Sequence, residues 1–391
     1  VTDADQMESI FAASNPQVVF HAAAHKHVPI LERNPVEGVR TNVFGTQVLL
    51  EVMQRHGCRR LVFSSSATVY GNPERVPLTE ASPLSATNPY GRSKLFIEDM
   101  CRDLAIAEHW SNVPYIEPNG FRIGIVGSGP AGMACAADMA KAGCDVTVYE
   151  AFHQAGGVLK YGIPDFRLPN AVVDAEIENL RKLGVKFECN TLVGRLFTIE
   201  QMIAELGFDA VFIGTGAGYP SMLGIPGESL NNVLSANELL TRCNLMRAKE
   251  FPNHDTPLPL GRRVAVIGAG NTAMDAMRVC LRLGAEKVYC IYRRSRTECP
   301  ARAEEVEHAE QEGVEFHWLT NPVEILDDGD GDVRGMRCIR MELGEPDDSG
   351  RRRPVPVKGS EFEFETDQVV FAIGTNANPI IGQTSKLRLN K

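Results

Sequence analysis

Short apolar runs alternate with stretches of helical spacing from the first residues of the chain onward. Residues 17–24 (QVVFHAAA) and 60–66 (RLVFSSS) have the pattern of buried strands, whereas residues 34–56 and 89–109 have the spacing of helices. Strands that alternate with helices pair in parallel, so residues 1–110 are expected to form part of an α/β domain.

A complete strand–helix–strand unit follows at residues 121–150. Apolar runs predict strands at 122–126 and 145–149, and a helix of small residues at 133–142 joins them. The first strand runs into the sequence GSGPAG, which has the GxGxxG spacing of a dinucleotide-binding turn. This unit organises the rest of the chain.

Each glycine of this turn has a separate physical task. Gly127 permits the tight turn, Gly129 lets the backbone approach a pyrophosphate, and Gly132 lets helix and strand pack closely. The phosphates would then lie at a helix N-terminus, where free N–H groups favour anions. Glu150 ends the second strand and can accept hydrogen bonds from ribose hydroxyls.

A second nucleotide unit begins at residue 262 (RRVAVIGAGNTA). Strands are expected at 264–267 and 287–291, with a helix at 274–283 and a glycine turn at Gly268 and Gly270. Arg293 and Arg294 occupy the place where the first unit has Glu150. Guanidinium groups pair with a 2′-phosphate that a carboxylate would repel, so the second nucleotide is expected to be NADP(H) rather than NAD(H).

Local sequence patterns also predict the structure of several other stretches. Residues 155–169 (AGGVLKYGIPDFRLP) read as an extended segment whose glycine pair can lie against a flat ring system. A helix is expected at 171–183, and strands are expected at 210–216 and 368–375. The acidic run 327–332 departs from the calcium-loop pattern and is expected to turn a hairpin. The basic run 351–354 is expected to be a solvated loop.

Composition narrows the class of protein. The net charge of −10 argues against binding to nucleic acid or an anionic membrane, and no apolar run approaches the roughly 20 residues that span a bilayer. Ten cysteines without a CxxC spacing suit a reduced, cytoplasmic protein. His21, His25 and His27 have no acidic or cysteine partners at ligand spacing, so no metal site is expected.

Three residues of the opening segment can move a proton together. Ser66 ends a strand, and Tyr90 and Lys94 are one helical turn apart, so their side chains share a face. A lysine ammonium beside a tyrosine lowers the phenol pKa, and a serine hydroxyl completes a relay. Ser66, Tyr90 and Lys94 are therefore the candidate catalytic residues of this segment.

Residues 1–110 resemble extended short-chain dehydrogenases/reductases, in particular nucleotide-sugar epimerases and dehydratases. The matching text is HAAAHKHVPILERNP, TNVFGT, FSSSATVYG and PYGRSK. The resemblance implies Ser66, Tyr90 and Lys94 as a catalytic triad with Asn42 in support. The family's first strand and NAD-binding glycine loop are not among these residues, so we expect no epimerase or dehydratase activity from them.

Residues 117–391 resemble the glutamate synthase small-subunit-like flavoproteins, which include the larger subunit of a ferredoxin:NADP reductase and the sulfide dehydrogenase α subunit. The shared text includes VGSGPAG, GGVLKYGIPDFRLP, GTGAGYP, VIGAGNTAMD, YRRSR and PARAEEVEHAEQEGV. The resemblance implies FAD on the first unit and NADPH on the second. It implies FAD contacts at Gly127, Ser128, Gly129, Ala131, Gly132, Glu150, Gly157 and Arg167, and NADP contacts at Gly268, Gly270, Asn271, Thr272, Arg293 and Arg294.

The expected fold is therefore α/β, with two nested Rossmann-like domains for FAD and NADPH preceded by a partial Rossmann-like segment. The expected limits are 1–110 for the dehydrogenase-like segment, 111–120 for a linker, 121–256 with a return segment 366–391 for FAD, and 257–365 for NADPH. The family's cysteine-rich iron–sulfur domain is not found in the chain. Its last motif, a Gly-Asp pair that the resemblance places at the ribityl and pyrophosphate groups of FAD, is not found either, so we expect flavin binding that is weakened but not lost.

The expected function is FAD-dependent oxidation of NADPH, with electrons passed to a small molecule, a protein acceptor or a second oxidoreductase subunit. Truncation of the family pattern would reduce this activity. Two alternatives remain open, an NAD-dependent nucleotide-sugar epimerase or dehydratase built on the opening segment, and a non-catalytic hybrid that binds nucleotides without turnover.

Overall fold

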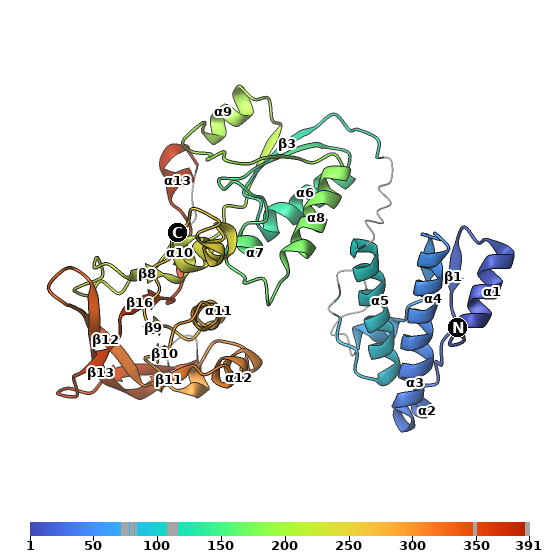
Figure 1. The fold of residues 1–391 in the computed structure, drawn as a ribbon. Coiled ribbons are helices and arrows are strands. Elements are labelled where there is room, and N and C mark those ends of the chain that lie inside the picture. Colours follow the sequence, from blue (N-terminus) through green and yellow to red (C-terminus); the bar gives the residue numbers. More distant parts are fainter. Residues whose placement is uncertain (72–77, 79–81, 83, 108–115, 347–349, 388–391) are drawn as a thin grey trace. The chain divides into compact units, whose positions relative to one another are not determined.

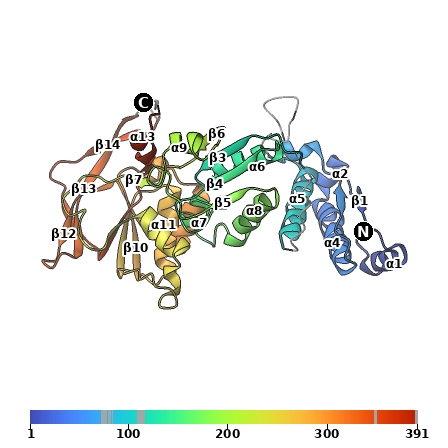
Figure 2. The same cartoon turned by 90° about the horizontal axis from the view of Figure 1, so that it is seen from above.

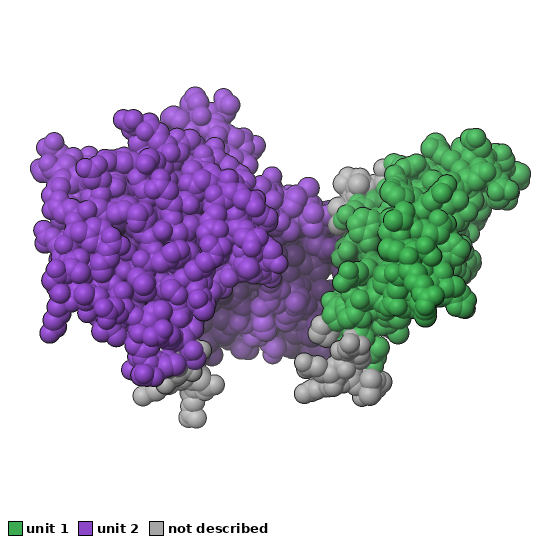
Figure 3. All heavy atoms as spheres, turned by 90° about the horizontal axis from the view of Figure 1, so that it is seen from below, with its two compact units in different colours: residues 1–112 green, residues 113–391 purple. Residues whose placement is uncertain are grey.

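The computed structural model describes residues 1–391 except 72–77, 79–81, 83, 108–115, 347–349 and 388–391 (Figure 1). The chain forms two compact units, residues 1–112 and residues 113–391 (Figure 3). The division falls within the linker expected at 111–120, whose residues 111–115 lie outside the described part of the chain.

The first unit contains a pair of parallel strands flanked by helices. Val19 lies opposite Leu61 in this pair, and apolar side chains of α1, α4 and α5 pack together beside it. Its elements are α1 (Ala4–Ser14), β1 (Val19–His21), α2 (Val28–Arg33), α3 (Pro35–Gly38), the π-helical segment η1 (Val39–Phe44), α4 (Gly45–Arg55), β2 (Leu61–Phe63), the 3-10 turn η2 (Ala67–Tyr70) and α5 (Pro89–Ala107).

Residues 113–391 contain two parallel sheets, each the centre of one lobe. The first lobe has the strand order β5-β4-β3-β6 (Figure 2). Helices α6 and α8 pack on one face of this sheet, and α9 and α13 pack on the other. Its elements are β3 (Arg122–Val126), α6 (Pro130–Lys141), β4 (Asp145–Tyr149), α7 (Val158–Tyr161), α8 (Asn170–Lys182), β5 (Lys186–Glu188), α9 (Ile199–Ala204), β6 (Ala210–Ile213) and α13 (Ile380–Thr384).

The segment after β4 differs from the sequence expectation. Residues 155–169 were expected to be extended, but residues 158–161 form the short helix α7. Gly157 has a φ of 53°, and its carbonyl accepts hydrogen bonds from the N–H groups of Lys160 and Tyr161. A glycine that reverses the backbone therefore starts a helical turn here, which a pattern of apolar residues does not reveal.

The second lobe is built around five parallel strands in the order β11-β10-β9-β16-β8. Alternate residues of β9 and β10 face the helices α10, α11 and α12 on one side of this sheet. Its elements are β8 (Val233–Ser235), α10 (Ala236–Leu240), η3 (Thr241–Leu245), η4 (Ala248–Glu250), β9 (Arg263–Ile267), α11 (Asn271–Arg282), β10 (Lys287–Tyr292), η5 (Arg296–Glu298), α12 (Ala303–Gln311), β11 (Glu315–Trp318) and β16 (Gln368–Phe371).

An antiparallel sheet covers the other side of this parallel sheet. Its strands are β12 (Thr320–Asp327), β13 (Val333–Pro346), β14 (Arg352–Pro356) and β15 (Phe362–Glu365), and apolar residues of β12, β13 and β15 pack on Ala265, Ile267 and Ile291. The hairpin expected around 327–332 is confirmed, because β12 and β13 pair on either side of it. The second lobe also draws β8 and β16 from outside the expected range 257–365.

Two short strands carry the chain between the lobes. β7 (Tyr219–Pro220) pairs in antiparallel orientation with β17 (Thr375–Asn376), so that Pro220 lies opposite Thr375. The N–H of Ser221 also donates a 3.0 Å hydrogen bond to the carbonyl of Gly374. The second lobe is thus inserted into the first through two adjacent connections.

Candidate functional site

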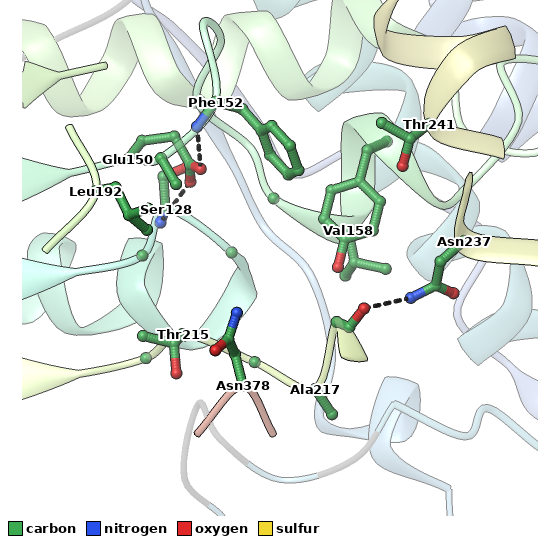
Figure 4. A pocket seen from close by; sticks show the side chains of 18 of the residues that line it. Ser128, Glu150, Phe152, Val158, Leu192, Thr215, Ala217, Asn237, Thr241 and Asn378 are labelled. Carbon is green, nitrogen blue, oxygen red and sulfur yellow. Dashed lines mark hydrogen bonds between the residues drawn. The ribbon is translucent and has the colours of Figure 1, made fainter. Parts of the chain in front are cut away.

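The first lobe contains a cavity of about 680 Å³ where its parallel strands end (Figure 4). The turn after β3, the end of β4 and the glycine-rich run 214–218 form one part of its wall. Residues of α10 and η3 from the second lobe form another part. A cavity at the carboxyl ends of parallel strands is where open α/β sheets hold their ligands.

The glycine turn after β3 leaves space for a phosphate group of a ligand to approach its backbone. A Cβ on Gly127 would lie 2.4 Å from the carbonyl oxygen of Gly214, and a Cβ on Gly132 would lie 1.9 Å from that of Gly127. A Cβ on Gly129 would meet nothing within 4 Å, although Gly129 lines the cavity. No side chain caps α6 at Gly129, so the first N–H groups of this helix remain available to an anion.

Glu150 lies buried in the wall of this cavity, with 5% of its surface exposed. Its Oε2 accepts hydrogen bonds from the N–H and the hydroxyl of Ser128, and its Oε1 accepts a 2.9 Å bond from the N–H of Phe152 (Figure 4). A carboxylate has about four acceptor positions, so these three donors leave one for a ligand hydroxyl. This geometry fits the ribose contact expected from the sequence.

A second cavity of about 400 Å³ lies over the glycine turn after β9. A Cβ on Gly268, whose φ is 124°, would lie 2.3 Å from the carbonyl oxygen of Ala372. A Cβ on Gly270 would meet nothing within 4 Å, and no side chain caps α11 at this residue. The second glycine turn, like the first, therefore leaves open space and free backbone N–H groups at a helix start, where an anion can bind.

One end of the second cavity is strongly basic. Arg293 and Arg294 follow β10, and Arg351 comes from the run 351–354 that was expected to be a solvated loop. That expectation is wrong for residues 352–354, which belong to the strand β14, while Arg351 lies just before this strand on the cavity wall. No aspartate or glutamate is among the described residues that line this cavity.

The two cavities share part of their walls. Pro220 and Asn237 line both of them. Asn237 is fixed there by a 3.1 Å hydrogen bond from its Nδ2 to the carbonyl of Gly218 (Figure 4). Ligands in the two cavities would therefore approach each other at these residues.

Most of the residues expected to bind a nucleotide lie on these walls, and three are placed elsewhere. Gly132 packs inside the first turn, and Asn271 Oδ1 accepts a 3.1 Å hydrogen bond from the N–H of Arg302. Arg167 contacts the second lobe instead of the first cavity. The first wall includes Gly127, Ser128, Gly129, Ala131, Glu150 and Gly157, and the second includes Gly268, Gly270, Thr272, Arg293 and Arg294.

The candidate catalytic residues of the opening segment lie within residues 1–112. Lys94 is buried, and its Nζ donates a 2.6 Å hydrogen bond to the carbonyl of Ser64 and lies 5.8 Å from the ring centroid of Tyr90. Burial lowers the pKa of this lysine. Ser66 caps η2, where its Oγ accepts a hydrogen bond from the N–H of Thr68.

His21 and His25 of this segment have protein partners. His21 Nε2 lies 2.8 Å from Thr46 Oγ1, and the N–H and carbonyl of His25 are both bound by the side chain of Asn42. Among the described residues, no group of three or more His, Cys, Asp and Glu side chains could hold a metal ion. The same part of the chain contains no helix with the length and apolarity needed to cross a bilayer.

Sequence reasoning missed the wall that α10 and η3 provide. Thr241, Arg242 and Met246 line the first cavity although they lie about 110 to 120 residues after its glycine turn. Tyr161 also lines it, and burial, followed by the nearby Glu150 carboxylate, raises the pKa of its phenol. The sequence signal for Thr241, Arg242 and Met246 was their position between the two nucleotide units, whereas Tyr161 lies in the segment 155–169 that was expected to contact a flat ring system.

Comparisons with known proteins agree with this geometry. The family model of pyridine nucleotide-disulphide oxidoreductases matches residues 121–391. The NADP(+)-dependent formate dehydrogenase subunit beta of Moorella thermoacetica is 46% identical over 262 residues, which are 66% of this chain and 36% of that protein. The glutamate synthase [NADPH] small chain of Escherichia coli is 37% identical over 283 residues, 71% of this chain and 59% of that one.

The chain thus spans less than two thirds of the length of these relatives. The structure of FprA from Mycobacterium tuberculosis in complex with NADPH shares the fold, with a TM-score of 0.58 and 22% identity over 68% of this chain and 73% of that one. A GDP-mannose 4,6 dehydratase model matches residues 1–114, which confirms the resemblance of the opening segment. Because the first model covers most of the chain, the protein belongs to the pyridine nucleotide-disulphide oxidoreductase family.

Proposed function

We propose that this protein takes a hydride from NADPH onto FAD and passes the electrons to a partner protein. The observation that carries the proposal is the contact between the two cavities at Pro220 and Asn237. Each cavity has its own glycine turn and uncapped helix, so two nucleotides can bind with their pyrophosphates far apart and their reactive ends together.

The first cavity fits FAD. Gly127, Gly129 and the start of α6 would hold the pyrophosphate, and the free acceptor position of Glu150 would bind a ribose hydroxyl. Ser128 and Gly157 line the same end, and the N–H of Gly156 donates a 2.9 Å hydrogen bond to Ser128 Oγ. These contacts keep Glu150 and the glycine pair in one fixed arrangement.

The second cavity fits NADPH. Gly268, Gly270 and Thr272 would hold the pyrophosphate at the start of α11, and Arg293 and Arg294 would pair with the 2′-phosphate. NADPH supplies a hydride, and FAD accepts it and releases the electrons to an acceptor. The side chains at Pro220 and Asn237 would orient the two reactive ends and exclude water between them.

The names of the relatives support a protein partner. The Moorella protein is the beta subunit of a formate dehydrogenase, and relatives from Geobacter sulfurreducens are beta subunits of an NADPH-Fe(3+) oxidoreductase. The corresponding acceptor of this chain would be a second oxidoreductase subunit.

Anaerobic titration of the full chain, supplied with FAD, tests the proposed function. NADPH should bleach the flavin absorbance, and NADH at the same concentration should do so much more slowly. Ferricyanide should then restore the flavin spectrum. A flavin spectrum that NADPH leaves unchanged, or a protein that retains no FAD after gel filtration, would contradict the proposal.

A further inference from the structure

The segment between α7 and α8 contacts two helices of the second lobe. Its Arg167 donates to both carboxylate oxygens of Asp275 on α11, and Arg167 Nε lies 3.3 Å from Glu305 Oε1 on α12. The side chain of Asp275 is 5% exposed and that of Glu305 is 13% exposed. A planar guanidinium group therefore meets two largely buried carboxylates, each from a fixed direction.

Phe166 makes a second contact with α11. The centroid of its ring lies 3.9 Å from the guanidinium carbon of Arg282 and 4.7 Å from that of Arg278. Arg278 Nη1 donates a 2.7 Å hydrogen bond to Glu305 Oε2 on α12. Arg282 Nη2 donates a 2.9 Å bond to Glu312 Oε1 on the same helix. Because a cation is attracted to the face of an aromatic ring, Phe166 is held by two arginines whose own positions are fixed.

This contact joins equal numbers of positive and negative side chains, which suits a structural role better than the binding of an ion. Hydrogen bonds between charged groups are directional, whereas apolar packing is not, so such a contact fixes an orientation. The side chains concerned are Arg167, Arg278, Arg282, Asp275, Glu305 and Glu312.

The two lobes have a connection about which they can turn. β7 and β17 carry the chain between them and pair with each other, and two adjacent segments are a common form of hinge between domains. Side-chain contacts elsewhere must then fix the angle between the lobes. The segment after α7 supplies such contacts. Tyr161 of α7 lines the first cavity, and α11 starts at the second glycine turn, so this angle sets how the two cavities face each other.

We propose that Phe166 and Arg167 are positioning residues, which hold the two lobes at the angle that lets hydride pass from NADPH to FAD. This inference rests on the proposed function, because it assumes that the two cavities hold these nucleotides. Neither residue is among the described residues that line the cavities. Both should therefore act on the rate of transfer between bound nucleotides and leave the binding of each nucleotide nearly unchanged.

The test uses a double variant of the full chain, Phe166→Leu with Arg167→Lys. This variant keeps an apolar side chain and a positive charge but removes the ring and the guanidinium group. Stopped-flow absorbance at saturating NADPH measures flavin reduction in protein loaded with FAD. The rate should fall at least about tenfold, because small displacements of reacting groups cost rates of this order. The Kd for NADPH should change less than about threefold.

Hydrogen exchange of the full chain without nucleotides gives a readout that does not depend on turnover. The N–H groups of residues 167 and 168 both donate to the carbonyl of Pro164, so their exchange reports whether the segment stays in place. In the double variant they should exchange at least about fivefold faster, because local opening sets their exchange rate.

Phe187→Leu with Arg181→Lys is the matched control, since the Arg181 guanidinium carbon lies 5.6 Å from the centroid of the Phe187 ring within the first lobe. It should keep the rate and the exchange within about twofold of the unmodified protein. If the double variant reduces its flavin as fast as the control, or if only its Kd for NADPH changes, the positioning role is overturned. If NADPH does not reduce the flavin of the unmodified protein, the proposed function fails and this inference fails with it.

Discussion

Arg167 donates 2.8 Å hydrogen bonds from Nη1 to both carboxylate oxygens of Asp275, and this pair joins the two lobes. Arg167 follows α7 in the first lobe, and Asp275 lies on α11, the helix that starts at the second glycine turn. Arg167 Nε also lies 3.3 Å from Glu305 Oε1 on α12. The chain segment that contains α7 and lines the first cavity is thereby bonded to α11, the helix that begins at the second cavity.

Asp275→Ala should lower the free energy of unfolding by about 3 kcal/mol, because it leaves Arg167 partly buried without its main partner. Only 5% of the Asp275 side chain and 20% of the Arg167 side chain are exposed. Asp145→Ala is the control, since Asp145 pairs with Lys186 on the surface and should cost less than about 1 kcal/mol. Chemical denaturation measures both, and equal losses would contradict the structural role of the Arg167–Asp275 pair.

Gly129→Ala should mainly weaken FAD binding, whereas Gly127→Ala should mainly lower the stability of the fold. Gly129 has an ordinary φ of −69° and open space at its Cβ position, so Gly129→Ala should cost less than about 1 kcal/mol of stability. The added methyl group would occupy the proposed pyrophosphate position and weaken FAD binding at least about tenfold. Gly127 has a φ of 99°, and Gly127→Ala should destabilise the fold by about 3 kcal/mol.

Thermal unfolding and FAD titration separate these two effects. The first cavity would not be an FAD site if Gly129→Ala bound FAD as tightly as the unmodified protein. A stable Gly127→Ala protein would show that the turn relaxes away from the carbonyl of Gly214.

Alanine substitutions of Arg293 and Arg294 should differ in their effect on stability. Arg293 is exposed at the cavity mouth, so Arg293→Ala should raise the Kd for NADPH about tenfold, with little change in stability or in NADH binding. Arg294→Ala should weaken NADPH binding and also lower the unfolding midpoint, because it removes the hydrogen bond to the Arg352 carbonyl. Equal Kd values for NADPH and NADH in the unmodified protein would refute the assignment of both residues.

Asp367 should make stability depend on pH through its contact with Arg263. Hydrogen bonds from the Arg263 side chain, and then from its N–H, hold the pKa of Asp367 below its ordinary value. A carboxyl group whose folded-state pKa is lowered stabilises the fold above its unfolded pKa, and this contribution is lost as the pH falls through the folded value. The contact joins the start of β9 to the residue before β16.

Asp367→Asn should therefore destabilise the protein at neutral pH, and the difference from the unmodified protein should shrink below about pH 4. Urea unfolding at a series of pH values measures this difference. A difference that stays constant from neutral to acid pH would show that the charge of Asp367 contributes nothing to stability.

The sequence predicted those parts of the fold that depend on neighbouring residues. β3, β4 and the hairpin between β12 and β13 could be located because apolar runs, glycine turns and acidic turn residues act over a few positions. The two glycine turns could be assigned for the same reason, since Gly127 and Gly268 each need a backbone that other residues rarely adopt.

The rest of the site depends on contacts between distant residues. Arg351 reaches the second cavity because the backbone of its neighbour Arg352 bonds to Arg294, 58 positions earlier. Arg167 was expected at the flavin, but the buried carboxylate of Asp275, 108 positions later, holds its guanidinium. A basic run and a single arginine have the same local pattern whether they meet solvent, a ligand or an acid, so only the fold distinguishes these cases.

Because β7 pairs with β17, the second lobe is an insertion within the first lobe whose two ends lie next to each other. Removing it would leave two chain ends that already lie side by side, because Pro220 faces Thr375 and Ser221 bonds to Gly374. A linker of a few residues could join them at a small cost in loop entropy, and β3, β4, β5 and β6 would keep their register. Coenzyme preference in such a fold can therefore change by exchange of a whole lobe, with no rearrangement of the flavin-side sheet.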